Sequence, residues 1–477
     1  MEKNNQSIIK ESKFEKFFEV KKRGSNLRTE ILAGVTTFLT MAYILMVNSQ
    51  MISLTGPSYE AIYIATAIGA VIGTVCMGLI ARLPLALASG MGLNAFFVYT
   101  VCFTFGLSYA NALVLVLFDG IIFIILTVTG LRKKIFNAIP KVVRNSISAG
   151  IGLFIAFIGL QDAGIITGNS STLVQLASLN FLGSATWASV MPIIVCFLGV
   201  VIICVLTKLK VKGAALIGIL GAAVLYYALG FTVPGFYVDF DFGSMNPLAA
   251  FGDWSHDAFL KVFTDGFNFS GFLSVSGNTV GELVLIVLTS ILAFVMVDMF
   301  DTIGTLFGAA ERGGLLTADG EVPNMDKAML SDAIATATGA ICGTSTVTTY
   351  VESTAGIAEG GKTGVTSLAT AVCFLVAMFL APIAKLIPSA ATSSALIYVG
   401  ILMMGSVKNI EWGDIAEALP AFITIVMMAF TYNISYGIGL GIITYVLVKL
   451  LTGKVKDINV LTVVIGILFS LTFFLTH

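Results

Sequence analysis

The chain has 477 residues, of which 57% are hydrophobic and 11% charged, and its formal net charge is −1. A soluble domain carries about a quarter charged residues, so this composition excludes a water-soluble fold of this length. The small net charge gives no overall field that would attract nucleic acid. The apolar residues form stretches near the roughly 20 residues that a helix needs to cross a bilayer, without the alternation of membrane strands. We therefore expect an all-α polytopic membrane protein.

The first 28 residues hold eight basic side chains and no apolar core. They predict a cytoplasmic tail and not a signal peptide. Fourteen candidate membrane elements follow, in two series separated by a polar extracytoplasmic loop, 231–280. The first series is 29–50, 60–81, 86–106, 109–130, 143–161, 189–207 and 213–230. The second is 283–309, 328–343, 344–360, 364–387, 392–407, 418–451 and 458–476.

The distribution of basic residues predicts the orientation in the cell membrane. With the N-terminus inside, Arg132, Lys133 and Lys134 fall in a cytoplasmic loop, whereas the outer segment 162–188 has no Lys or Arg. Near the end of the chain the rule is less clear. The stretch 418–451 is too long for one helix and is interrupted at 432–435, so the topology of 418–477 stays open.

An internal repeat relates the two series. Residues 64–74 read IATAIGAVIGT and residues 334–344 read IATATGAICGT, with eight of eleven positions identical. Because seven elements are an odd number, the two halves would insert in opposite orientations. Such inverted repeats are typical of transporters, with the substrate site near the midplane at broken helices.

Each copy of the repeat is followed by a segment that disfavours a continuous helix. After the first come Gly90 and Gly92 in 87–97, and after the second comes a β-branched run, 346–351, which prefers an extended backbone. We expect a short strand meeting a half-helix in elements 3 and 10. Asn94 and Glu352 stand the same number of residues before a later glycine, so the repeat pairs Asn94 with Glu352. Two half-helix N-termini would then face one site.

Acids inside the membrane are expensive and therefore functional candidates. Asp298 and Asp301 are spaced i, i+3 and share one helix face. Because two close carboxylates do not both ionise cheaply, one should hold a proton and serve in proton coupling. The alternative is a structural cap or pair with a neighbouring helix.

Three further side chains carry hypotheses of their own. Glu352 stands at the expected helix break, where it either accepts N–H groups of a ligand or caps the half-helix that begins at Ser353. Asn94 is an uncharged counterpart that both donates and accepts, or else a packing amide. For Asp119, another buried acid without an evident partner, a structural role is favoured.

Metal and nucleotide chemistry have little support in the sequence. Six cysteines without a CxxC spacing are interpreted as packing residues. The two histidines, His256 and His477, lie near or outside span ends, so no metal site or cofactor is expected. Residues 356–363 fit the P-loop pattern, but no soluble domain with a parallel sheet surrounds them, and ATP binding is disfavoured.

Five segments together resemble the nucleobase–cation symporter-2 superfamily, and specifically its branch of azaguanine, adenine, guanine and hypoxanthine permeases. They are LRTEILAGVTTFLTMAYILMVN (27–48), LASGMGLNAFFVYTV (87–101), ISAGIGLFIAFIGL (147–160), VDMFDTIGTLFGAAERGGLL (297–316) and TTYVESTAGIAEGGKTG (348–364). The resemblance implies a uracil-permease-like fold of fourteen elements in a seven-plus-seven inverted repeat. It also implies a core at 29–130 and 281–387, a gate at 131–230 and 388–477, and dimerisation through the gate.

The resemblance also implies roles for individual residues. Carried over by motif, Asn94, Asp298, Asp301 and Glu352 match substrate and coupling residues, and Tyr350 falls beside the substrate. Uracil and xanthine carriers often have a Glu on span 8, where this chain has Asp298 and Asp301. That difference favours an oxopurine or adenine as substrate.

The resulting hypothesis is import of a purine base with a proton by an elevator-like movement of the core against the gate. Phe96, Phe97 and Phe300 are expected to pack on the purine ring. The alternatives are an anion or sulfate carrier on the same fold, a channel, and a membrane enzyme, for which no nucleophile arrangement exists. The sequence leaves open which purine is carried and whether protons or sodium ions drive transport.

Overall fold

The computed structural model describes residues 13–131, 139–236, 246–312, 314–317 and 321–475. The expected cytoplasmic tail is thus described from Lys13 on, where α1 (Lys13–Phe18) begins. The basic residues 132–134 and His477 lie outside the described ranges. Within these ranges, ten helices are long and apolar enough to cross a membrane. The expectation of a helical, polytopic membrane protein is confirmed, while the fourteen-element inverted repeat stays a prediction.

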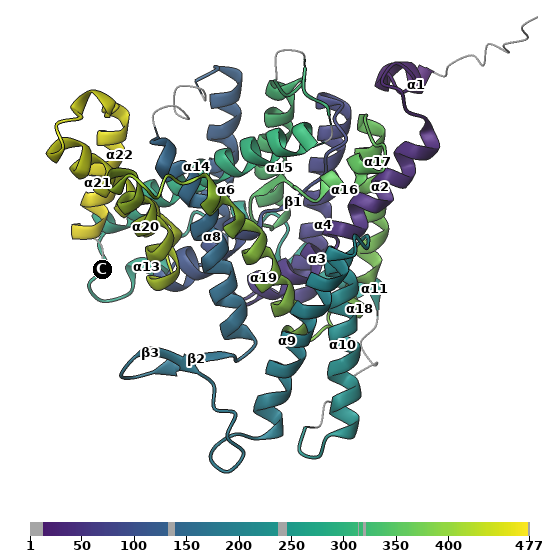
Figure 1. Ribbon diagram of the computed structural model, residues 1–477, viewed down its shortest axis with the longest axis horizontal. Helices are drawn as coiled ribbons and strands as arrows, with labels where there is room; N and C mark the ends of the chain where they lie inside the picture. The colour runs from purple at the N-terminus through teal and green to yellow at the C-terminus, as the bar shows by residue number, and fades with distance from the viewer. Residues whose placement is uncertain (1–12, 132–138, 237–245, 313, 318–320, 476–477) are drawn as a thin grey trace, which may run out of the picture.

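One group of helices packs around a small central sheet (Figure 1). Its long members are α2 (Leu27–Met41), α3 (Tyr43–Ser53), α4 (Tyr59–Cys76), α6 (Tyr109–Val128), α14 (Val280–Arg312), α15 (Met325–Cys342) and α17 (Gly364–Ala377). Its short pieces are η1 (Met77–Ala81), α5 (Met91–Ala95), η2 (Phe96–Thr104), α16 (Ser353–Ala358), η3 (Met378–Leu380) and α18 (Ala381–Ala384). The expected spans 86–106 and 344–360 are therefore strand and half-helix segments.

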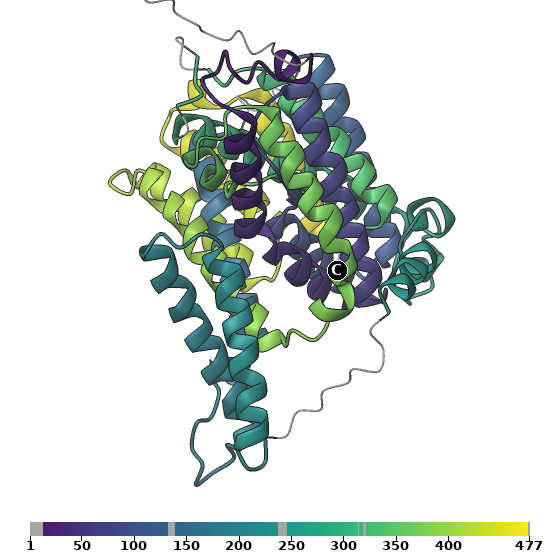
Figure 2. The ribbon, with the colours of Figure 1, turned by 90° about the vertical axis from the view of Figure 1, so that its right-hand side faces the viewer.

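A second group of helices packs mainly on itself. It comprises α8 (Lys141–Asp162), α9 (Trp187–Lys208), α10 (Ala214–Thr232), α19 (Ser389–Met404), η4 (Gly405–Asn409), α20 (Ile415–Phe430), α21 (Ile434–Leu451), η5 (Val455–Asp457) and α22 (Val460–Leu475). The pair α9 and α10 extends away from the other helices in both Figure 1 and Figure 2. The groups meet where α3 contacts α19 and where α14 contacts α21 and α22.

The long stretch 418–451 is divided into α20 and α21 by a turn at 431–433. Tyr432 has a left-handed backbone there, with φ 55°, which ends the first helix. The Asn433 side-chain oxygen then accepts the backbone N–H of Tyr436 at 3.1 Å and caps the second helix. The interruption expected at 432–435 is thus present, and it produces two separate helices.

Two connecting segments contain more structure than the sequence suggested. Residues 162–188 include an antiparallel hairpin of β2 (Ile166–Asn169) and β3 (Leu173–Leu176). The segment 231–280, expected as a loop, contains α11 (Pro247–Asp257), α12 (Lys261–Thr264) and α13 (Ser270–Leu273). The hydrogen bond from the His256 ring holds the pKa of Asp257 below its ordinary value.

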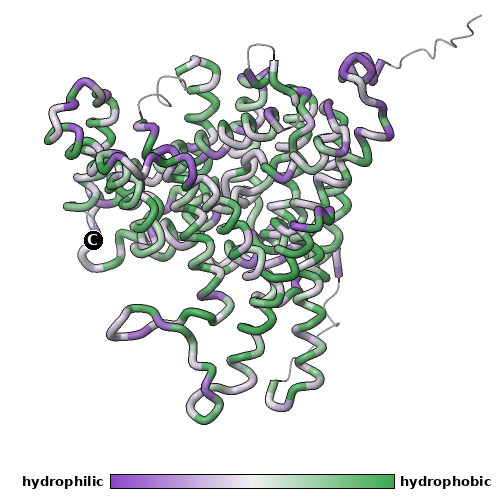
Figure 3. The backbone as a smooth tube through the Cα atoms, viewed as in Figure 1, coloured by the Kyte–Doolittle hydropathy of each residue, from purple (hydrophilic) through white to green (hydrophobic). Residues whose placement is uncertain are grey.

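Side-chain polarity follows the expectation for a protein surrounded by lipid. In Figure 3 the helices are mostly in hydrophobic colours, and α1 stands out as hydrophilic. Large apolar side chains face outward on α9 and α10, for example Phe197, 63% exposed, and Val224, 70% exposed. Such surfaces suit contact with hydrocarbon better than contact with water.

The two copies of the sequence repeat lie on α4 and α15, and these helices contact each other. Gly339 of α15 lets the helix approach the strand β4 closely, since a Cβ there would lie 2.7 Å from Val347 Cγ2. Gly73 of α4 faces α15 in the same way, 2.8 Å from Ala335 Cβ. The small residues of the repeat therefore bring both copies and both strands together at the centre of the first helix group.

Candidate functional site

The centre of the site is a pair of short strands that come from distant parts of the chain. β1 (Leu87–Ser89) runs antiparallel to β4 (Val347–Thr349), with Leu87 opposite Thr349 and Ser89 opposite Val347. Backbone bonds extend the pairing, from Gly90 N–H to Thr346 O at 2.9 Å and from Tyr350 N–H to Ala86 O at 3.0 Å. The prediction of short strands meeting half-helices in elements 3 and 10 is confirmed.

Glu352 stands directly before α16 and is partly exposed. Its side chain makes no capping bond to that helix, which argues against the capping alternative. Instead, its Oε1 accepts the Tyr43 hydroxyl of α3 at 2.7 Å, and Thr40 donates to its backbone oxygen at 3.3 Å. The carboxylate thus retains a second oxygen for a donor group from a ligand.

Asp301 and Tyr350 lie beside Glu352. Asp301 is partly exposed on α14 and is close enough for its charge to interact with that of Glu352. The Tyr350 ring is 6% exposed, and its hydroxyl donates to Ser89 O at 2.5 Å. We call these three residues and Tyr43 the Glu352 cluster; Glu352 and Asp301 are its partly exposed members.

Asp298 is fully buried one helical turn before Asp301. Its Oδ2 accepts the Thr336 hydroxyl at 3.4 Å, and in the described part of the chain its Oδ1 has no hydrogen-bond partner. Asp332 on α15 lies close enough for charge repulsion with Asp298. It accepts the hydroxyls of Thr302 at 2.9 Å and Thr349 at 3.0 Å. Asp298 and Asp301 therefore lie at one site, but Asp301 is partly exposed whereas Asp298 is fully buried.

Asn94 does not occupy the position expected from the repeat. The strand pairing relates Gly90 to Tyr350, because Gly90 N–H bonds to Thr346 O just as Tyr350 N–H bonds to Ala86 O, so Glu352 corresponds to Gly92. The proposed pairing of Asn94 with Glu352 is therefore wrong by two residues. Asn94 is fully buried within α5, and its Oδ1 accepts the Ser89 hydroxyl at 2.7 Å.

The aromatic residues expected around the substrate have different surroundings. Phe96 is fully buried and packs against Phe294, with ring centroids 4.7 Å apart. Phe97 is also fully buried and lies 6.0 Å from the Tyr109 ring. Of the three rings, only Phe300 is partly exposed. Phe96 and Phe97 thus act here as packing residues.

Two residues of the site were missed in the sequence. Asp332 lies inside the expected span 328–343, so the rule that singled out the other buried acids applies to it as well. Tyr43 carries no such signal, because a tyrosine in an apolar stretch is common. Its role becomes visible only through its bond to Glu352.

The segment that fits the P-loop pattern has another use. The backbone N–H groups of Lys362 and Thr363 donate to the two carboxylate oxygens of Glu30, at 3.1 and 3.2 Å. The Thr366 hydroxyl donates to the same side chain at 2.6 Å. Glu30 is fully buried and so occupies the place where a phosphate would bind. The sheet here is antiparallel and two-stranded, which disfavours nucleotide binding further.

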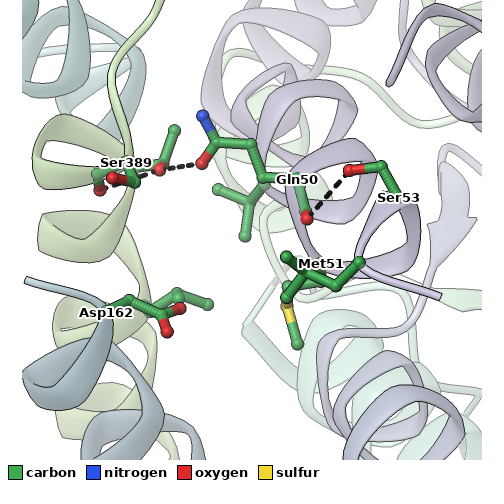
Figure 4. A pocket seen from close by; sticks show the side chains of 9 residues that line it. Gln50, Met51, Ser53, Asp162 and Ser389 are labelled. Carbon is green, nitrogen blue, oxygen red and sulfur yellow. Dashed lines mark hydrogen bonds between the residues drawn. The ribbon is translucent and has the colours of Figure 1, made fainter. Parts of the chain in front are cut away.

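A pocket of about 320 Å³ lies between the two helix groups (Figure 4). Gln50 and Met51 of α3 face Asp162 of α8 and the start of α19 across it. The Gln50 amide donates to Ile387 O at 2.8 Å and accepts the Thr392 hydroxyl. This side chain therefore joins α3 to the beginning of α19.

Comparison with known proteins places this geometry in a family. The Permease family (Xan_ur_permease) matches residues 28–440. The guanine/hypoxanthine permease PbuO of Bacillus subtilis is 39% identical over 474 residues, covering 96% of this chain and 100% of that protein. The adenine permease AdeQ of Escherichia coli is 36% identical over 456 residues, covering 96% of this chain and 95% of that protein.

A solved structure supports the fold. The transmembrane domain of a cyanobacterium bicarbonate transporter, BicA, is similar with a TM-score of 0.60 at 17% identity, covering 86% of this chain and 97% of that chain. At this identity the likeness concerns the fold alone. The family match and the two permeases cover the strands and the Glu352 cluster. The chain therefore belongs to the permease family of nucleobase–cation symporter-2 proteins, within its purine permease branch.

Proposed function

We propose that this permease imports purine nucleobases across the cell membrane by proton symport. The proposal rests on a set of intramembrane acids around the paired strands β1 and β4 that lack basic partners. In the part of the chain that the structure describes, no Lys or Arg forms an ion pair with Asp298, Asp301, Asp332 or Glu352. Relatives named as guanine/hypoxanthine and adenine permeases support the substrate class.

The Glu352 cluster suits a neutral purine base. The free oxygen of Glu352 would accept a ring N–H, because a carboxylate provides strong acceptors. The Tyr43 hydroxyl fixes the other oxygen and thereby orients the carboxylate. Phe300, which is partly exposed, would pack against the base. Asn94 would read an opposite edge of the base after releasing the Ser89 hydroxyl.

Protons are the coupling ions that the acids favour. An unpaired ionised carboxylate inside the membrane is expensive, and binding a proton removes that cost. Asp298, Asp301 and Glu352 would bind the proton together with the base. Among the described residues, no group of three or more His, Cys, Asp and Glu is arranged to hold a metal ion.

We further propose an elevator mechanism, in which the core, 29–130 and 281–387, moves against the gate, 131–230 and 388–477. The two helix groups support this division, since each packs mainly on itself. The N-terminus would lie in the cytoplasm, and the gate elements would provide the dimer contact. With this orientation, the Gln50 pocket lies on the extracytoplasmic side.

An anion carrier on the same fold is disfavoured. An anion site needs positive groups, but the Glu352 cluster and the acids behind it contribute only negative charge and hydroxyls. At low dielectric, a carboxylate beside a bound anion would repel it with an energy on the order of several kcal/mol. The similarity to a bicarbonate transporter therefore concerns the scaffold and not the site.

Uptake of radiolabelled hypoxanthine by cells lacking their own purine carriers tests the proposal. We expect saturable uptake that rises as the external pH falls and collapses when a protonophore removes the proton gradient. Unlabelled adenine, guanine and hypoxanthine should be compared as competitors with uracil, xanthine and sulfate. Competition by sulfate but not by purines, or uptake driven by sodium at constant pH, would contradict the assignment.

Replacing Gln50 by alanine tests the proposed movement. The change removes a hydrogen-bonded link between α3 and α19 worth about 1 kcal/mol, so the conformation seen here should lose population by about fivefold. We expect faster labelling of a cysteine introduced by L396C, at a buried position of the same pocket, by a membrane-impermeant maleimide. The L396C protein with native Gln50 is the control. An unchanged labelling rate would argue against Gln50 as a link between the two moving parts.

A further inference from the structure

A fourth fully buried acid, Asp119, lies outside the site described above. It stands halfway along α6 and has no exposed surface. Its Oδ2 accepts the Thr346 hydroxyl at 3.3 Å, and its Oδ1 has no hydrogen-bond partner among the residues that the structure describes. Throughout the described ranges, no Lys or Arg forms an ion pair with it. A carboxylate in this position is satisfied poorly when ionised.

Close helix packing brings Asp119 to this place. The next residue, Gly120, lies directly against α15, because a Cβ there would be 2.5 Å from the backbone nitrogen of Ala337. α6 also contacts α14, which carries Asp298. Any larger residue at position 120 would push α6 away and remove Asp119 from Thr346. The approach of the three helices therefore places two acids around the same strand segment.

Asp119 and Asp298 are connected through the residues that lead into β4. Thr346 donates to Asp119, and the next residue, Val347, accepts the Thr336 hydroxyl at 3.1 Å. That same hydroxyl lies 3.4 Å from Asp298 Oδ2. The charges of Asp119 and Asp298 are close enough to repel each other. Each acid thus has one weak hydroxyl donor and one free oxygen.

The other groups around Asp119 do not neutralise it. α15 contributes Asp332, whose charge also acts on Asp119. η2 contributes Tyr99 and Cys102, which carry no positive charge. α12 contributes Lys261, which pairs with Asp265. This helix packs near the start of α6, where the Asn111 side chain donates to Gly266 O. The start of α6 is about 12 Å along the helix from Asp119.

We propose that Asp119 is a second proton-binding carboxylate, coupled to Asp298 by charge repulsion, and that it sets the alkaline limit of transport. The inference rests on the proposed proton symport. When one acid of the pair ionises, its charge makes the other hold its proton more tightly. The pair therefore retains a proton at pH values at which a single acid would have lost it. This keeps the proton-coupled cycle running in more alkaline surroundings.

Two variants should shift the pH profile of hypoxanthine uptake in opposite directions. D119N removes one of the charges that repel an ionised Asp298, so Asp298 loses its proton earlier, and the alkaline limb should move to lower pH by roughly one unit. T346V removes the one hydroxyl that donates to Asp119 within the described ranges, which makes ionisation of Asp119 more costly and should move the alkaline limb to higher pH. D253N, the same change at an exposed position on α11, is the control and should leave the profile unchanged.

Exchange of labelled for unlabelled hypoxanthine in proteoliposomes, which needs no net proton movement, shows that each variant is folded and binds the base. Alkaline limbs of D119N and T346V that coincide with that of the unmodified protein would overturn the inference. A shift of both variants in the same direction would overturn it too. If D119N does not fold, the direction of the T346V shift decides. Failure of the unmodified protein to respond to pH would instead refute proton symport itself.

Discussion

Replacing Glu352 by glutamine should lower the uptake of labelled hypoxanthine by about 10- to 100-fold, because a hydrogen bond to a charged partner contributes about 1.5–3 kcal/mol. The glutamine keeps the shape and an acceptor for the Tyr43 hydroxyl. It loses the charge and presents an NH₂ group to the ring N–H of the base. We therefore expect weaker binding of the base, measured as a higher KM and a higher Kd of the purified protein.

The matched control is E359Q, seven residues further along. Glu359 is an exposed acid at the end of α16, and it pairs with Lys212 at 2.7 Å. Such surface pairs contribute about 0–1 kcal/mol, so uptake should be nearly unchanged. Immunoblots of the membrane fraction would confirm equal amounts of both variants. Normal hypoxanthine uptake by E352Q at equal abundance would show that the base binds elsewhere.

Much of the fold could be predicted because the bilayer imposes simple rules on sequence. Long apolar stretches located the helices, and the β-branched run at 346–351 together with Gly90 located the two strands. The division of 418–451 followed from a polar interruption, and Asn433 supplies the cap. In contrast, the short helices of 247–273 were missed, since they are held by packing on α4 and α6 and not by a periodic pattern of their own.

The site was predicted less completely because chemistry depends on which side chains meet. The cost of buried charge singled out Asp298, Asp301 and Glu352, and the structure brings them into electrostatic contact. Sequence spacing failed for Asn94, because counting back from a distant glycine gives a register that differs by two residues from the register of the paired strands. Tyr43 and the threonine hydroxyls around the acids could not be found in this way, since their role depends on distances across helices.

These threonines indicate how the acids are accommodated without basic residues. Thr302, Thr336, Thr346 and Thr349 each direct a hydroxyl to a buried carboxylate. A hydroxyl can donate to an ionised acid and can accept from a protonated one by rotating. A lysine or arginine would instead fix the acid in its charged state. A set of hydroxyl partners therefore suits carboxylates that change protonation during a transport cycle.

Replacing Asp298 by asparagine should abolish the accumulation of hypoxanthine against its gradient while leaving exchange of the base across the membrane largely intact. Asparagine has the same shape and still accepts the Thr336 hydroxyl, so the packing of α14 against α15 should be maintained. It cannot bind a proton, and the proposed symport therefore loses its coupling group. In proteoliposomes with an imposed pH gradient, we expect at least about a tenfold loss of accumulation, which corresponds to 1.4 kcal/mol of coupling.

The combination of the two measurements distinguishes coupling from binding. If Asp298 only contacted the base, D298N would reduce exchange and accumulation together, as E352Q should. If Asp298 only stabilised the fold, D298N would reduce the amount of protein in the membrane. Loss of accumulation with retained exchange follows only when the acid carries the proton. Full accumulation by D298N would instead move the coupling role to Asp301 or Glu352, the partly exposed acids on the other side of the same site.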